Sequence, residues 1–227
     1  LAAAWNSTNM DKTLNSEGLI PLTDPYLSTT VTSIPTDAVD WVKIELRNSS
    51  TPATVVASYA KFIDINGQII EEDETNMKFT GVAAGSYYVA VQHRNHFGIM
   101  SSSVVDLTAS TPSYDFSDAQ NKAWDNTSVT TNDAMKDLGS GKFGMWDGDA
   151  NSDGTISYNG GGNDRIEVLN KVGASTPGNS VTDTYATEDV NMNGDVNYNG
   201  GGNDRISILN TVGASTPGAT ISQHIPQ

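Results

Sequence analysis

An internal duplication near the end of the chain is the feature that most limits how it can fold. Residues 149–178 and 189–218 are identical at 21 of 30 positions, with a constant offset of 40 residues. In each copy a stretch rich in Asp, Asn and Gly precedes apolar residues at three-residue spacing, which is the spacing of one helical face. Each copy therefore predicts a loop followed by a helix of two to three turns. The expected N-cap and C-terminal residues are Asn163 with Gly173, and Asn203 with Gly213.

The loop of the first copy has the ligand pattern of a calcium-binding loop. Asp149, Asn151 and Asp153 stand at alternate positions, followed by Gly154 and Thr155. Calcium takes six to eight oxygen ligands at about 2.3–2.6 Å, and alternate side chains of a tightly turning loop can converge on one such ion. The sixth-position glycine permits the turn, and the seventh residue contributes its backbone carbonyl. The second copy repeats the pattern with Asp189, Asn191, Asn193 and Asp195.

The twelfth position of such a loop normally carries an acidic ligand, but here it holds Gly160 in the first copy and Gly200 in the second. The nearest downstream carboxylates are Asp164 and Asp204, and each follows an Asn-Gly-Gly-Gly stretch whose glycines tolerate positive φ. We expect the stretch to loop out and return, so that Asp164 closes the first site and Asp204 the second. The pattern thus predicts two calcium ions. The alternative is a set of Asx turns that cap helices on an acidic, solvated surface.

Two further pairs of equivalent residues predict how the repeats pack. Ile156 and Val196 occupy the eighth position, where paired loops of this kind form a short β contact. Arg165 and Arg205 follow the closing aspartates directly, and a guanidinium can hold a carboxylate through two parallel hydrogen bonds. Each Arg is therefore expected to orient carboxylates of its own site or of the other repeat. The alternative is a helix arginine that faces solvent.

Upstream of the repeats, apolar and polar residues alternate, which is typical of β-strands. Clear examples are 42–46 and 87–91, and Asn66-Gly67 is a hairpin signal between two apolar runs. Further strands are expected at 55–60, 78–82, 102–107 and 113–116. About seven short strands predict a Greek-key β-sandwich of immunoglobulin-like or prealbumin-like shape. The chain is thus expected to be mostly β, with an N-terminal arm at 1–36, the β-sandwich at 37–118, a connector at 119–146 and two calcium-binding repeats at 147–227.

The composition excludes several classes of function. The 12 Lys and Arg residues against 27 Asp and Glu give a formal charge of −15, which disfavours nucleic acid and anionic lipid as partners. No apolar stretch approaches the roughly 18 to 20 residues that cross a bilayer, so no membrane span is expected. The absence of cysteine removes disulfides, thiolate metal sites and cysteine nucleophiles.

No set of residues predicts an enzyme. His93 and His96 would lie on opposite faces of an extended strand without an acidic neighbour in the sequence, so structural or surface histidines are expected. The acidic run 71–74 is expected to be the solvated end of a hairpin rather than a pair of catalytic carboxylates. The sequence also lacks a Gly-x-Ser-x-Gly motif and a phosphate-binding loop that follows a strand.

The repeats and several upstream motifs resemble a known family. The Tyr-Asn-Gly-Gly-Gly-Asn-Asp-Arg runs and the motifs at 18–26, 39–42, 85–89, 93–96 and 188–194 are similar to the C-terminal region of large secreted or surface proteins of Bacteroidetes-type bacteria, labelled hemagglutinin-like. More distantly, the loops resemble the duplicated calcium loops of dockerins, which implies a small dockerin-like two-repeat unit after the sandwich. The resemblance implies a secreted or cell-surface module.

Together these features predict a non-catalytic extracellular module that calcium stabilises and that serves structure or adhesion. Its expected location is outside the cell, either secreted or on a bacterial cell surface. Its expected partners are calcium and further copies of itself, assembled into a surface fibre or sheath. The alternative is a carbohydrate- or protein-binding module of a larger secreted protein, with a glycan or another surface protein as its partner.

Overall fold

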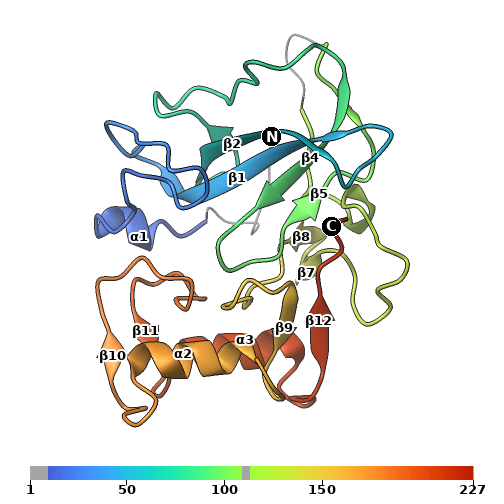
Figure 1. Ribbon diagram of the computed structural model, residues 1–227. Coiled ribbons are helices and arrows are strands. Elements are labelled where there is room, and N and C mark those ends of the chain that lie inside the picture. The colour runs from blue at the N-terminus through green and yellow to red at the C-terminus, as the bar shows by residue number, and fades with distance from the viewer. Residues whose placement is uncertain (1–9, 109–112, 227) are drawn as a thin grey trace.

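The computed structural model describes residues 10–108 and 113–226, and this part of the chain is mostly β (Figure 1). The helices are α1 (Thr13–Ser16), α2 (Asp164–Val172) and α3 (Asp204–Val212), with a 3-10 turn η1 (Gln120–Lys122). The strands are β1 (Ala38–Asn48), β2 (Val55–Asp64), β3 (Ile69–Ile70), β4 (Ser86–Gln92), β5 (Ile99–Met100), β6 (Val105–Asp106), β7 (Lys136–Gly139), β8 (Lys142–Gly144), β9 (Thr155–Ser157), β10 (Ser180–Val181), β11 (Val196–Asn197) and β12 (Thr220–Ser222). Within the described ranges, no helix reaches the length and apolarity that crossing a bilayer requires.

The largest element is an antiparallel, curled sheet with strand order β3-β2-β1-β4-β5, in which β6 also pairs with β4. The predicted strands at 42–46 and 87–91 are confirmed as parts of β1 and β4. The predicted hairpin around Asn66-Gly67 is confirmed as β2 and β3, with Phe62 opposite Ile70. Alternation of apolar and polar residues therefore identified the centre of the sheet correctly.

The two faces of this sheet are covered by different segments. On one face, Ile44 and Leu46 of β1 pack with Phe116 and Met135 from the region that follows the sheet. On the other face, Trp41 lies against Phe62 with ring centroids 3.8 Å apart, and the arm covers both through the buried side chains of Leu14 and Ile20. Residues 1–9 of the predicted arm lie outside the described residues.

The predicted two-sheet sandwich is not confirmed. In the described ranges the other sheets are the two-stranded pairs β7–β8, β9–β12 and β10–β11. The segments 78–82 and 113–116 form no strand, and only Val105–Asp106 does so within 102–107. Phe79 and Tyr114 nevertheless pack on the core, because a loop can bury an aromatic side chain without joining a ladder. In the predicted connector, Met135 is 1% exposed and Leu138 is 37% exposed.

The two repeats exchange strands around their helices. The strand β9 in the first loop pairs with β12, which follows the second helix, and β11 in the second loop pairs with β10, which follows the first helix. Ile156 is therefore opposite Ile221, and Val196 is opposite Val181. The expected contact between the two eighth positions is wrong, because each loop pairs with the strand after the other repeat's helix. Figure 1 shows the two strand pairs at opposite ends of α2 and α3.

The helix ends are as predicted, and the predicted helix face is confirmed in part, since Val172 and Val212 are buried. Asn163 accepts the N-cap hydrogen bond from Ile166 N at 3.2 Å, and Asn203 does so from Ile206 N at 3.0 Å. The fully buried apolar positions are Val168 and Val172 in α2, and Ile208 and Val212 in α3. Ile166 and Leu169, which three-residue spacing had placed inward, are only partly buried. A four-residue spacing defines the core face instead.

The last residues connect the repeats back to the sheet. After β12, Gln223 accepts a hydrogen bond from Gly98 N at 2.9 Å, and Ile225 packs with Ala90 and Met100. A Cβ atom on Gly98 would lie 2.6 Å from Cδ1 of Ile225, so glycine permits this close approach. Arg47 in β1 donates to the Pro226 carbonyl at 2.6 Å. The tail therefore belongs to the packing of the sheet as much as to the second repeat.

Replacement of Ile225 by Ala tests the tail's role. Ile225 is 4% exposed, so Ile225→Ala should lower the free energy of unfolding by roughly 2 to 5 kcal/mol in urea denaturation. Leu138→Ala, at a 37% exposed position, is the matched control and should change it by less than about 1 kcal/mol. Equal losses in the two variants would show that the tail is not part of the folded core.

Candidate metal sites

The two loops have the same hydrogen-bond pattern around their first aspartate. In the first loop, Asp149 accepts from the backbone amides of Asp153 at 3.1 Å and Gly154 at 3.2 Å. In the second loop, Asp189 accepts from the equivalent amides, those of Asn193 at 3.1 Å and Gly194 at 3.0 Å. Each first carboxylate therefore points into its own loop. Asp149 is 6% exposed and Asp189 is fully buried.

The third and fifth positions of each loop form consecutive Asx turns. In the first loop, Asn151 accepts from Asp153 N at 3.0 Å, and Asp153 accepts from Thr155 N at 2.8 Å. In the second loop, Asn191 accepts from Asn193 N at 3.1 Å, and Asn193 accepts from Asp195 N at 2.9 Å. The turns expected as the alternative to calcium are thus present, and they hold the predicted ligand residues in one tight loop.

The displaced aspartates do return to the loops. Asp164 and Asp204 are both 0% exposed. Asp164 accepts from Ala150 N at 2.9 Å, Asn151 N at 3.4 Å and Ser157 N at 2.7 Å. The equivalent donors to Asp204 are Val190 N at 2.9 Å, Asn191 N at 3.4 Å and Asn197 N at 2.8 Å. Each closing carboxylate thus reaches across its loop, and backbone amides contact both of its oxygens.

The glycine stretch makes this return possible. Gly160 and Gly162 have φ of +103° and +67°, values that side chains with a Cβ rarely adopt. Their carbonyls accept from side-chain amides, Gly160 from the N-cap residue Asn163 at 2.5 Å and Gly162 from the loop residue Asn151 at 2.8 Å. The second repeat has the same geometry at Gly200 and Gly202. The bulge therefore both presents the helix N-cap and places the following Asp inside the loop.

Electrostatics within the loops favour a cation. Burial raises the pKa of Asp149 to about 6 and that of Asp164 to about 7, and at Asp164 the charge of Asp149 adds to the effect. Burial likewise raises the pKa of Asp189 to about 6 and that of Asp204 to about 7. Hydrogen bonds from backbone amides lower these pKa values but do not cancel the cost of burial.

The donor set fits a hard dication. Carboxylates, Asn side chains and backbone carbonyls are oxygen ligands of the kind that calcium takes. Among the described residues, no three His, Cys, Asp or Glu side chains form a metal-holding group by themselves. An ion in either loop would therefore depend on Asn and carbonyl oxygens as well as on aspartate. Thr155 would contribute through its backbone carbonyl. The equivalent residue of the second loop is Asp195, whose carboxylate accepts from Asp183 N at 3.4 Å.

Arg165 and Arg205 make no ion pair in the part of the chain that the structure describes. Their guanidinium groups instead lie over tyrosine rings of the same repeat, at 4.7 Å from Tyr158 and 4.9 Å from Tyr198. The expected pairing with site carboxylates is wrong, because those carboxylates are already held by backbone amides inside the loops.

A buried polar cluster that sequence reasoning missed joins the sheet to the repeats. Asp40 of β1 is 0% exposed and contacts His93 at 3.0 Å, Arg94 at 3.1 Å and the Tyr185 hydroxyl at 2.6 Å. Burial alone would raise the pKa of Asp40, but the Arg94 charge and the His93 hydrogen bond hold it at about 2. Asp40 is therefore ionised at neutral pH and is the acid around which this cluster forms.

The histidines lie within this cluster rather than on opposite faces. His93 and His96 face each other with their Nδ1 atoms 3.1 Å apart, because the chain turns after β4 instead of continuing as a strand. Burial and the neighbouring His93 lower the pKa of His96 well below its ordinary value. The expectation of structural histidines fits these buried contacts, although the expected orientation is wrong.

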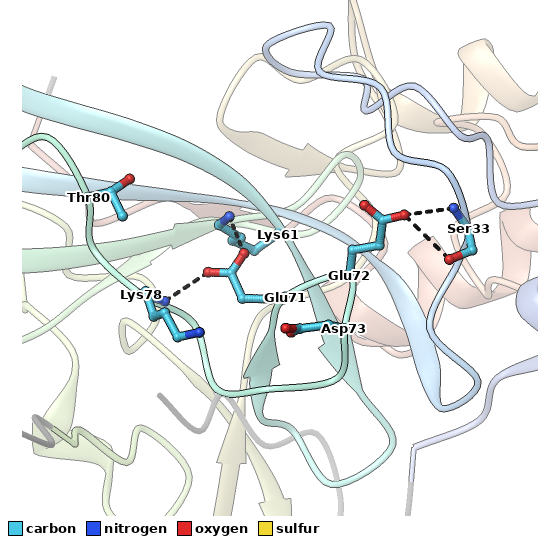
Figure 2. A pocket seen from close by; sticks show the side chains of 7 residues that line it. All are labelled: Ser33, Lys61, Glu71, Glu72, Asp73, Lys78 and Thr80. Atoms are coloured by element: carbon cyan, nitrogen blue, oxygen red, sulfur yellow. Dashed lines mark hydrogen bonds and ion pairs between the residues drawn. The ribbon is translucent and has the colours of Figure 1, made fainter.

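The acidic run near β3 lines a hollow of about 590 Å³, shown in Figure 2. Glu71 pairs with Lys61 at 2.6 Å and accepts from the backbone amide of Lys78 at 2.8 Å. Glu72 accepts from the backbone amide of Ser33 at 2.9 Å and from the hydroxyl and amide of Thr32. These contacts connect the arm and the 71–80 loop to the edge of the sheet. The two carboxylates therefore stabilise the packing of these segments.

Comparison of this chain with protein-family models, with curated proteins and with solved structures found no match.

The buried acid of the cluster can be tested by substitution. Asp40→Ala leaves the Arg94 guanidinium buried without its carboxylate and should lower the free energy of unfolding by roughly 3 to 5 kcal/mol in urea denaturation. The control is Asp37→Ala, which removes a solvent-exposed pair with Lys12 and should cost less than about 1 kcal/mol. A small loss for Asp40→Ala would contradict the view that this ion pair holds the interface.

The loop carboxylates predict an unusual pH dependence in the absence of calcium. Their pKa values in the folded protein lie above the ordinary value of 3.8, so folding favours their protonated forms. Their stabilising contribution is complete below about pH 4 and is lost as the pH rises through about 7. With chelator present, the urea midpoint should therefore fall between about pH 4 and about pH 7.

Saturating calcium should abolish or reverse this trend, because the ion binds the deprotonated carboxylates. Asp40 interferes little, since its contribution to stability changes between its folded pKa of about 2 and the ordinary value of 3.8, at the lower edge of this window or below it. A calcium-free protein that gains stability across the same window would contradict the assignment of raised pKa values to the loops.

Proposed function

We propose that this chain is a non-catalytic structural or adhesion module that acts outside the cell and is stabilised by two calcium ions. The observation that carries this proposal is the duplicated loop. Each copy adopts the same turns and buries two aspartates, Asp149 with Asp164 and Asp189 with Asp204. A bound dication would neutralise these carboxylates, whose burial and mutual repulsion otherwise oppose folding.

Calcium suits these loops better than magnesium. Magnesium demands near-ideal octahedral geometry and retains several waters, whereas calcium accepts six to eight ligands of mixed type in a flexible arrangement. The donor set here is mixed, with Asp carboxylates, Asn amides and carbonyls. Extracellular calcium at millimolar concentration fills even modest sites of this kind.

The architecture expected from the sequence is part of the same proposal. We infer that the repeats form a dockerin-like unit, since each has a calcium-type loop followed directly by a helix. We also infer the predicted β-sandwich at 37–118, with the segment around Phe116 as part of the layer that covers the main sheet. Packing of Phe116 and Met135 on the sheet supports this second inference.

A glycan- or protein-binding module is the second candidate. The guanidinium groups of Arg165 and Arg205, each lying over a tyrosine, provide an aromatic and cationic surface next to exposed glycines. Binding of a monomer to a glycan array, weakened by Arg165→Ala and Arg205→Ala, would favour this candidate. Concentration-dependent filaments in electron microscopy would instead favour self-association into a fibre or sheath.

Calorimetry tests the proposed ions directly. Native protein should bind two calcium ions, and Asp164→Ala and Asp204→Ala should each remove one while leaving the other site occupied. Binding to the folded state alone should add about 2.7 kcal/mol at a hundredfold excess over Kd, so chelator should lower the Tm. The control is Glu188→Ala, an acid next to the second loop that pairs with Lys171 at 3.5 Å and should leave both ions bound. A Tm that chelator does not change would count against calcium.

A further inference from the structure

The turn that follows β4 is packed into the repeat unit. His93, Arg94, Asn95, His96 and Phe97 are each no more than 8% exposed. Figure 1 shows the β4–β5 connection extending from the sheet toward the repeats. Phe97 packs in the apolar core of the repeats rather than in the core of the sheet. The turn is therefore a structural part of both halves of the molecule.

Asn95 contacts the first residue of both loops. Its carbonyl accepts from the backbone amides of Gly148 at 3.0 Å and Asp149 at 3.2 Å. Its side-chain Nδ2 donates to the backbone carbonyls of Asp189 at 2.6 Å and Thr187 at 3.2 Å. Asp149 and Asp189 are equivalent positions of the duplication. A single fully buried residue thus holds the start of each loop.

Neighbouring contacts keep the Asn95 side chain in place. Its Oδ1 lies 2.7 Å from Nδ1 of His96, which leaves Nδ2 directed at the second loop. Arg94 makes a parallel connection, since its guanidinium donates to the Ala186 carbonyl and its own carbonyl accepts from the Ser152 hydroxyl at 3.4 Å. A shift of either loop would therefore strain the contacts of the other.

We propose that Asn95 couples the two loops, so that an ion in one loop raises the affinity of the other for calcium. This inference rests on the calcium binding proposed above. An ion that orders the first loop fixes the Asp149 amide, and through it the Asn95 carbonyl. The Asn95 amide then already holds the Asp189 carbonyl in place, so less conformational entropy is lost when the second loop binds its ion. Linkage makes the effect reciprocal.

The repeats are also connected by a route that does not include Asn95. The helices α2 and α3 contact each other, and the exchanged strands link each loop to the opposite helix. Replacement of the Asn95 side chain separates the two routes. Asn95→Leu keeps the size and the backbone carbonyl that the first loop uses, but it removes the amide that holds Asp189.

The experiment is a mutant cycle read by calcium calorimetry. Asp153→Ala disables the first loop by removing a ligand whose side chain is exposed, and the affinity of the second loop is then measured. In the native background, Asp153→Ala should weaken calcium binding at the second loop by about fivefold or more, within the usual range of site coupling. In the Asn95→Leu background, the same change should alter it by less than about twofold.

A second readout separates coupling from loss of fold. Hydrogen exchange at the Asp189 and Val190 amides should slow when calcium fills the first loop of the native protein, but not in Asn95→Leu. If Asn95→Leu does not fold, Asn95→Asp replaces it, because it lacks the Nδ2 donor at nearly unchanged size. Tyr185→Phe is the matched control, since it keeps the ring and removes only a hydroxyl that donates to Asp40 of the sheet at 2.6 Å, so coupling should persist.

Two results would overturn the coupling by Asn95. One is independent binding of two ions to the native protein. The other is a fivefold effect that remains in Asn95→Leu, which would assign the coupling to Arg94, the helices or the exchanged strands. A protein that binds no calcium in any background would instead contradict the proposed function itself, and the coupling with it.

Discussion

The ion pair between Asp40 and Arg94 lies where the sheet meets the repeats, because Asp40 also accepts from Tyr185 and Arg94 also donates to the Ala186 carbonyl. Asp40 follows a register shift in the pairing of β1 with β2, and its carboxylate contacts the turn after β4 and Tyr185 of the repeat region. Removal of one partner of a buried pair is costly, whereas replacement of the whole pair by apolar residues often is not. The pair is therefore expected to add little net stability compared with apolar residues, although loss of either partner alone would be costly.

The exchange of strands between the repeats connects them to each other. The strand in each loop pairs with a strand that follows the helix of the other repeat, since β9 pairs with β12 and β11 pairs with β10. The two repeats must therefore fold together, and the chain that forms β12 continues to Ile225 on the sheet. The loops and the sheet therefore stabilise each other. The predicted boundary at residue 147 marks a change in sequence pattern, and the segments on its two sides pack together.

Sequence reasoning succeeded where the contacts are local. The N-caps Asn163 and Asn203 and the return of Asp164 to its loop involve residues close in the chain, so spacing and glycine content were sufficient. It missed the Asp40 cluster, because His93 lies 53 residues away and only tertiary structure brings the two together. A signal was present, since an acid within the apolar run 39–42 needs a buried partner.

Part of the buried helix face and the strands at 78–82 and 113–116 were predicted incorrectly for the same reason. Which helical face is buried depends on the partner helix, and α2 packs on α3 through Val168 and Ile208 rather than through Ile166. Local spacing contains no information about that partner. Likewise, Phe116 is buried and Phe79 is partly buried although both lie in loops, because their packing partners, not their own alternation, place them.

The backbone amides inside the loops explain what a bound ion would add. Three amides already donate to each closing aspartate, so the loop has its shape without metal. These bonds orient the carboxylates but do not offset the cost of burying their charge. The pKa values of Asp164 and Asp204 therefore remain near 7. Calcium would therefore act on a loop whose turns are already formed, by compensating charge and by restricting the motion that remains. Because only this remaining motion is lost when the ion binds, modest ligands suffice for a useful affinity.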